Sequence, residues 1–116
     1  MSESVLVVGD KLHVMTRRLF TGDVHRHFVG EISAVSDPLF RAAGYVFVYD
    51  PGTNTYFKHP ELRTQLFSIS DFGHVITVLP RLVDMESLRY EIVDGRLMLV
   101  DDRDFSLEIA EFGPST

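Results

Sequence analysis

Two histidines and three arginines gather in the stretch TRRLFTGDVHRHFVG, residues 16–30. In an extended strand His25 and His27 lie on the same face about 6.6 Å apart, a separation that two imidazoles can close onto one metal ion. Glu31 falls on that face as well, so the first hypothesis is a metal site formed by His25, His27 and Glu31. Catalytic zinc needs a third protein ligand plus water, which Glu31, His13, His59 or His74 would have to supply, and nothing in the sequence brings these residues together, so we rank a zinc enzyme below the other two functions.

The same stretch also fits an anion or nucleic-acid site, because guanidinium groups bind phosphate and aromatic rings stack on bases. The candidate residues for such a site are Arg17, Arg18, His25, Arg26, His27 and Arg41. The overall charge speaks against a general nucleic-acid binder, since the net charge is −6 and residues 83–116 hold nine acids but three arginines. Phosphate neutralisation favours the opposite bias.

A third interpretation is an ordinary strand with one solvated face. If residues 24–35 form one strand, alternation places Arg26, Phe28 and Ile32 on the core side, and His25, His27 and Glu31 on the wetter side. Arg26 then needs a carboxylate, a carbonyl or an exit to water.

Other chemistries lack their residues. The chain has no cysteine, which excludes thiolate metal sites and thiol nucleophiles. It also lacks a glycine-rich phosphate loop and a GxSxG motif, so no cofactor is expected and the function is expected to be non-catalytic.

Short apolar runs with β-branched and aromatic residues, separated by Gly, Pro, Asn and Asp, predict an all-β chain. Asp94-Gly95 predicts a tight type I′ hairpin, and residues 88–109 read as a three-stranded antiparallel meander. Single helical turns are predicted at most in residues 37–43 and 83–88. The predicted strands are 12–20, 24–35, 43–49, 55–57, 65–69, 75–79, 88–93, 97–100 and 105–109.

A chain of 116 residues with 45% hydrophobic residues predicts one domain over residues 1–116, with residues 1–10 and 112–116 frayed. The mean hydropathy is +0.07 and the chain holds nine phenylalanines, which favours covering apolar surface in a homo-oligomer. The apolar run near the start is too short for a signal peptide or a membrane span, so a cytoplasmic protein without membrane contact is expected.

The order of the strands resembles the Sm-like (LSm) small β-barrels. The similarity extends over about residues 12–79 and is carried by the segments LHVMTRRLFTGD, HFVGEISAVSD, LFRAAGYVFVYD and LFSISDFGHVITVLP. The resemblance implies a small, strongly bent barrel and a tendency to form rings through strand pairing. The family's RNA-binding asparagine falls near Arg41 here, and Ser70-Asp71 stands where its Arg-Gly pair is expected, so RNA recognition is not implied.

Tyr45, Phe47 and Tyr49 alternate with Val46 and Val48, so both faces of this strand are apolar. Such a strand lies centrally in a sheet or at a subunit interface, and we name the three aromatic residues as candidate interface residues.

The sequence thus predicts a small strongly bent β-barrel of Sm-like or SH3-like type with a C-terminal antiparallel meander. We expect a non-catalytic binding or assembly module that takes another copy of itself or another protein as its partner. The alternative is an Sm-like nucleic-acid binding protein that uses the Arg/His segment.

Overall fold

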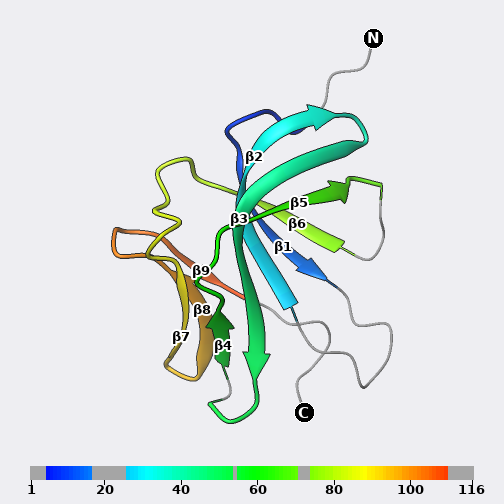
Figure 1. Ribbon diagram of the computed structural model, residues 1–116. Coiled ribbons are helices and arrows are strands. Elements are labelled where there is room, and N and C mark those ends of the chain that lie inside the picture. Colours follow the sequence, from blue (N-terminus) through cyan, green and yellow to red (C-terminus); the bar gives the residue numbers. More distant parts are fainter. Residues whose placement is uncertain (1–4, 17–25, 54, 71–73, 110–116) are drawn as a thin grey trace.

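The computed structural model describes residues 5–16, 26–53, 55–70 and 74–109, and within these ranges it contains strands but no helix. The all-β prediction is therefore confirmed (Figure 1). The strands are β1 (Lys11–Thr16), β2 (Arg26–Ser36), β3 (Leu39–Asp50), β4 (Thr55–Lys58), β5 (Arg63–Ser68), β6 (His74–Leu79), β7 (Arg89–Val93), β8 (Arg96–Val100) and β9 (Ser106–Glu108).

The predicted helical turns are both wrong. Asp37-Pro38 forms the turn of the β2–β3 hairpin, and β3 begins directly after it at Leu39. Residues 85–87 form a hydrogen-bonded turn, with the N–H of Leu88 donating to the carbonyl of Met85 at 3.4 Å. Both tracts are too short to offset the cost of helix nucleation, so strand pairing and a turn prevail.

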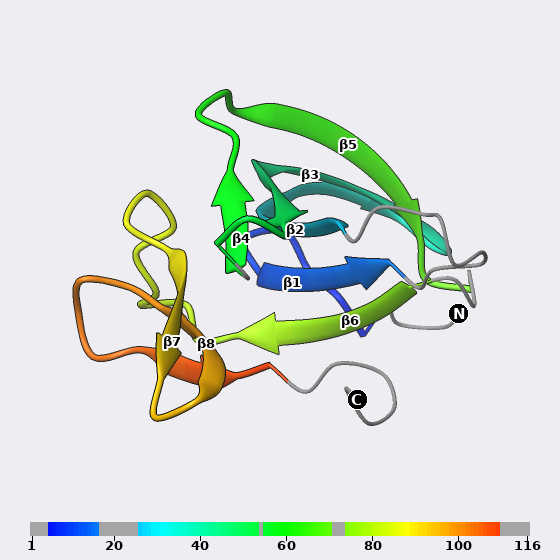
Figure 2. The same cartoon turned by 90° about the horizontal axis from the view of Figure 1, so that it is seen from below.

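Strands β1–β6 form one antiparallel sheet, which we call the large sheet, in the order β4-β3-β2-β1-β6. The long strand β3 pairs with β5 through its first half and with β4 through its second half. The sheet is strongly curved when seen from below (Figure 2). Among the described residues β5 and β6 do not pair, so the sheet is open and a closed barrel is not confirmed.

Two facing glycines let β2 and β3 approach closely in the curved region. Gly30 and Gly44 are partners in the β2–β3 ladder. A Cβ atom on Gly44 would lie 1.9 Å from the carbonyl oxygen of Val29 and 2.4 Å from the Cα of Gly30. Only glycine fits where another backbone comes this close.

Strands β7, β8 and β9 form a separate antiparallel sheet, which we call the meander. Its first hairpin turns at Asp94 and Gly95, whose φ angles are 53° and 77°. Positive φ at both positions is the requirement of a type I′ turn. The predicted hairpin and C-terminal meander are therefore confirmed.

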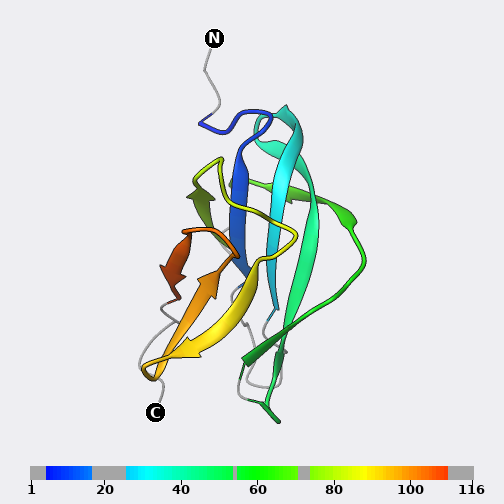
Figure 3. The same cartoon turned by 90° about the vertical axis from the view of Figure 1, so that its left-hand side faces the viewer.

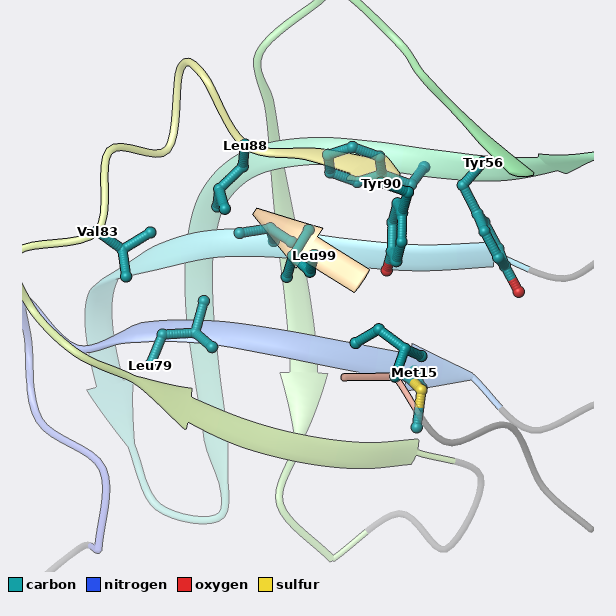
Figure 4. Packing of buried hydrophobic residues seen from close by; sticks show 10 residues of the cluster. Met15, Tyr56, Leu79, Val83, Leu88, Tyr90 and Leu99 are labelled. Carbon is teal, nitrogen blue, oxygen red and sulfur yellow. The ribbon is translucent and has the colours of Figure 1, made fainter. Parts of the chain in front are cut away.

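The molecule has two apolar cores, one on each face of the large sheet. The first lies inside the curve of the sheet, where the edge strands β5 and β6 contribute Phe67 and Ile76 to the same cluster as Phe28, Ile32 and Phe40. The second lies between the large sheet and the meander, which covers part of the outer face (Figure 3). In Figure 4 the side chains of Leu88, Leu99 and Tyr90 extend from the meander toward the strands that carry Met15 and Leu79.

The segment before β1 is part of the fold rather than a frayed end. Leu6 is buried in the inner core, the N–H of Gly9 donates to the carbonyl of Ile32 at 2.9 Å, and the N–H of Ile32 donates to the carbonyl of Asp10 at 2.8 Å. Residues 1–4 and 112–116 lie outside the described residues. In the described part of the chain, no helix has the length and apolar character needed to cross a membrane.

Candidate functional site

The first two residues of β2 show the opposite burial to the sequence prediction. His27, expected on the wet face, is 3% exposed, and Arg26, expected on the core side, is exposed. The meander covers the face that carries His27 and Val29, so both faces of β2 are buried over residues 27–30. Arg26 is the first residue of the strand, and its side chain is exposed although its ladder partner Val48 packs against the inner core.

His27 belongs to a buried cluster of three polar side chains from three strands. The hydroxyl of Tyr90 on β7 lies 2.7 Å from Nε2 of His13 on β1 and 2.5 Å from Nδ1 of His27 on β2. The two imidazole rings meet edge to face with their centroids 5.1 Å apart. We call His13, Tyr90 and His27 the His–Tyr–His cluster. It joins the meander to the large sheet by hydrogen bonds at the centre of their interface.

A phenol hydroxyl supplies one proton and accepts hydrogen bonds on its oxygen, so it can bridge two neutral imidazoles. One ring donates its N–H to the oxygen of Tyr90, and the hydroxyl donates to the unprotonated nitrogen of the other ring. Burial lowers the pKa of His13 to about 4, because the protonated form loses its hydration in the core. The cluster is therefore built for a neutral His13.

Aromatic rings surround the cluster and exclude water from it. Tyr56 of β4 stacks on His27 with centroids 4.4 Å apart and an interplanar angle of 22°. The same ring lies 4.6 Å from that of Tyr90, and Figure 4 shows Tyr56 and Tyr90 side by side. Phe47 of β3 meets Tyr90 edge to face at 5.1 Å. His13, His27 and Tyr90 are each buried, so the cluster lies inside the interface of the two sheets.

Two lysines of the large sheet bind the loop that leads into the meander. Lys58 on β4 donates to the carbonyls of Met85 at 3.1 Å and Glu86 at 2.6 Å, and its Nζ lies 4.3 Å from the centre of the Tyr45 ring. Burial lowers the pKa of Lys58, an effect that nearby Asp84 and Glu86 oppose. Such a cation over an aromatic face is stabilising.

Lys11 on β1 binds the same loop nearer its beginning, and its Nζ donates to the carbonyls of Arg81 and Val83, both at 2.7 Å. Hydrogen bonds from charged donors are among the stronger ones in proteins. The two lysines therefore fasten residues 81–86 to the large sheet.

The described members of the predicted anion site are not brought together. Arg26 pairs with Val48 at one end of the β2–β3 ladder, and Arg41 pairs with Ala34 near the other end. Alternation along β3 also puts Arg41 and the partner of Arg26 on opposite faces. His27 is buried, and Arg17, Arg18 and His25 lie outside the described residues.

The predicted metal site has two members in the described part of the chain. His27 is engaged with Tyr90 through Nδ1, and Glu31 is exposed two positions beyond the buried Val29. In residues 5–16, 26–53, 55–70 and 74–109, no three His, Asp or Glu side chains form a group able to hold a metal ion. The third candidate ligand, His25, falls outside these ranges.

The candidate interface strand occupies the middle of the large sheet. The apolar faces of this strand predicted a central place in a sheet or a subunit interface. In the structure the strand is central, because β3 lies between β2 on one side and β4 and β5 on the other. Phe47 is fully buried beneath the meander, and Tyr45 and Tyr49 are half-buried against the same core. The cover over Phe47 is therefore the chain's own meander.

Sequence reasoning missed the partner that gives the histidines their role. His13 and Tyr90 are 77 positions apart, and alternation within one strand cannot show which residue of another sheet will face it. The local signal was weak: Tyr90 is the single aromatic residue in the segment RYEIV.

Comparisons with known proteins find no match to this chain, whether against family models, curated proteins or solved structures.

Proposed function

We propose that this protein is a non-catalytic assembly module that binds further copies of itself through the free edges of the large sheet. We also propose that the large sheet is a small barrel of Sm-like or SH3-like type left open between β5 and β6. The strand path β5-β3-β2-β1-β6 supports this fold, because β1, β2 and β3 pair consecutively while β1 and β3 also pair with the later strands β6 and β5.

The observation that carries the proposal is the nature of the β6 edge. Its sequence, HVITVL, contains no Asp, Glu, Lys, Arg or Pro, which are the residues that normally protect an exposed edge from pairing. In the described residues β1 is its only ladder partner. Val78 on this strand is 54% exposed. An apolar, β-branched edge strand is a template for another strand.

The other end of the same sheet offers a second edge, β5 (RTQLFS), which carries Arg63 at its start and exposes an apolar side chain near its middle. Leu66 on β5 is 71% exposed, and Leu62, just before β5, is exposed as well. Pairing of β5 of one copy with β6 of the next uses two different surfaces, so the contact is head-to-tail. Such contacts generate rings when the rotation closes and filaments when it does not.

The location of the histidines favours a non-catalytic function. The two histidines with tyrosine partners lie inside the protein between two sheets, where a substrate has no access. They stabilise the domain that presents the sheet edges.

The test compares Val78→Lys with Val93→Lys, a matched control that adds the same charge at an exposed valine of the meander. Native mass spectrometry and light scattering are expected to find an oligomer for the unmodified protein and for Val93→Lys. Val78→Lys is expected to be a monomer, because the lysine places a charge at the pairing edge. A monomeric unmodified protein refutes the proposal, and so does dissociation by both variants.

A specific arrangement keeps nucleic-acid binding as the second candidate. Arg26, Val48 and Phe57 are partners across β2, β3 and β4, and directly opposed residues share one face. Arg26 and Phe57 are exposed, so this face offers a guanidinium and an aromatic ring to a nucleotide. Nucleic acid retained in the native mass spectrum and lost in Arg26→Glu would favour this function.

A further inference from the structure

The meander is held on the large sheet by side chains alone. In the described residues no ladder of backbone hydrogen bonds joins the two sheets. The apolar residues of the interface are joined at its centre by the His–Tyr–His cluster, with Tyr90 from the meander between His13 and His27 of the large sheet. Docking of the meander therefore depends on the state of these three groups.

We propose that the His–Tyr–His cluster is an acid-sensitive latch, and that proton uptake at His13 releases the meander from the large sheet while the large sheet stays folded. The proposal concerns regulation of the fold and does not depend on self-association.

The hydrogen bonds of the cluster suit neutral rings. A proton added to His13 buries a positive charge whose hydrogen-bond partner is a neutral phenol. If His27 is protonated as well, both rings direct an N–H donor at the hydroxyl oxygen of Tyr90. Neither ring can then accept the proton of that hydroxyl. Two such charges, with ring centroids 5.1 Å apart, also repel each other in the core.

Groups from each surrounding strand reinforce this sensitivity. Among the described residues, the rings that contact Tyr90 and His27 include Phe47 and Tyr56, and the Nζ of Lys58 lies 5.9 Å from the centre of the Phe47 ring. Arg89 and Glu91 flank Tyr90 in sequence but form an exposed ion pair with each other. The described groups facing the cluster are Phe47 of β3, Tyr56 of β4, Thr77 of β6 and Leu99 of β8.

The rest of the structure confines the effect to the meander. The ladders of β1, β2 and β3 belong to the large sheet itself, and the inner core around Phe28 and Ile32 lies on the face of that sheet away from the meander. Lys11 and Lys58 hold residues 81–86 by donating hydrogen bonds to backbone carbonyl oxygens, and these oxygens do not titrate. Residues 87–109 are therefore the segment that is released, and their release also breaks the hydrogen bonds from the N–H of Asp84 to Asp101 and from Arg103 to the carbonyl of Leu82.

The test follows backbone amide signals of the full chain by two-dimensional NMR from about pH 7.5 to about pH 4. We expect the signals of β7–β9 to lose their dispersion at a pH where the signals of β1–β3 persist. Loss of both sets in a single transition overturns the proposal, and so does a meander that stays docked at the lowest pH at which β1–β3 persist.

His13→Gln keeps a hydrogen-bonding group but cannot gain a charge, so its release midpoint is expected to fall by about one pH unit. His59→Gln removes a histidine outside the cluster and is expected to leave the midpoint unchanged. A midpoint in His13→Gln equal to that of the unmodified protein contradicts the latch. If His13→Gln does not fold, the imidazole signals of the unmodified protein decide, because protonation of His13 must coincide with loss of the β7–β9 signals.

Discussion

Gly44→Ala is the substitution with the sharpest expected effect on the large sheet. The added Cβ atom would meet the backbone of β2, 1.9 Å from the carbonyl oxygen of Val29 and 2.4 Å from the Cα of Gly30. Real Cβ contacts are not found below 3.0 Å, so β2 and β3 must part by about 1.1 Å at this point. No side chain can turn away to relieve the contact.

The size of the effect follows from the ladder hydrogen bonds on either side of Gly44. Lengthening a bond of about 2.9 Å by about 1 Å removes it, and each buried partner left unsatisfied costs about 1–3 kcal/mol. Two such losses give a destabilisation of about 3 kcal/mol or more. For a chain of this size that lowers the thermal midpoint by about 10 °C.

Two other glycines provide controls, one with a left-handed backbone but no close contact and one with neither feature. Gly95 has a φ of 77° and open space around it, so Gly95→Ala costs about 1 kcal/mol through the left-handed backbone alone. Gly52 lacks a left-handed φ, and its nearest neighbour is the flexible side chain of Asp50 at 3.3 Å, so Gly52→Ala is expected to be nearly neutral. Urea unfolding of the three variants gives the ranking. If Gly44→Ala is no less stable than Gly95→Ala, the close approach of β2 and β3 is wrong.

Two predictions concern pH and the meander. Burial lowers the pKa of His13 from 6.5 to about 4. On acidification His13 therefore takes up its proton at a higher pH in the unfolded chain than in the folded protein, and the stability falls as the pH decreases between these values. The free energy of unfolding falls by about 2 kcal/mol between about pH 7.5 and about pH 5. Urea unfolding of His13→Gln should show a shallower pH dependence of stability. A pH dependence equal to that of the unmodified protein contradicts the assignment of this effect to His13. The backbone N–H groups of Asp84, Phe105 and Arg103 lower the pKa of Asp101, so its carboxylate stabilises the fold above its ordinary pKa and loses this effect as the pH falls through the lowered one. At neutral pH Asp101→Asn faces the N–H of Asp84 with an amide and should lower the thermal midpoint, whereas the exposed Asp104→Asn should not; equal midpoints for the two variants would argue against the role of Asp101.

The positions of the strands could be predicted because their signals are local. Apolar runs and turn residues predicted a strand that overlaps each of the nine strands in the described residues, and Asp94-Gly95 predicted the hairpin turn correctly. The extra length of β3 was not predicted, since residues 39–42 are extended through pairing with both β2 and β5 and not through their own pattern.

The candidate site was predictable in part. Alternation correctly separated Arg26 and Phe28 from His27. The row of Arg26 was assigned to the core and that of His27 to water, yet Arg26 is exposed and His27 is buried. Alternation distinguishes the two faces of a strand, but it cannot predict that a second sheet will cover the polar face.

By itself the sequence determined an all-β chain, the positions of the strands along it and the C-terminal meander. These features depend on side-chain alternation and turn residues, which act over a few residues. Only the tertiary structure decided that the meander closes over β2 and brings Tyr90 between His13 and His27. Contacts across 77 positions arise from how two sheets pack together, and packing is a property of the folded whole. The histidines that suggested a metal or anion site thus include one that helps to hold the two sheets together.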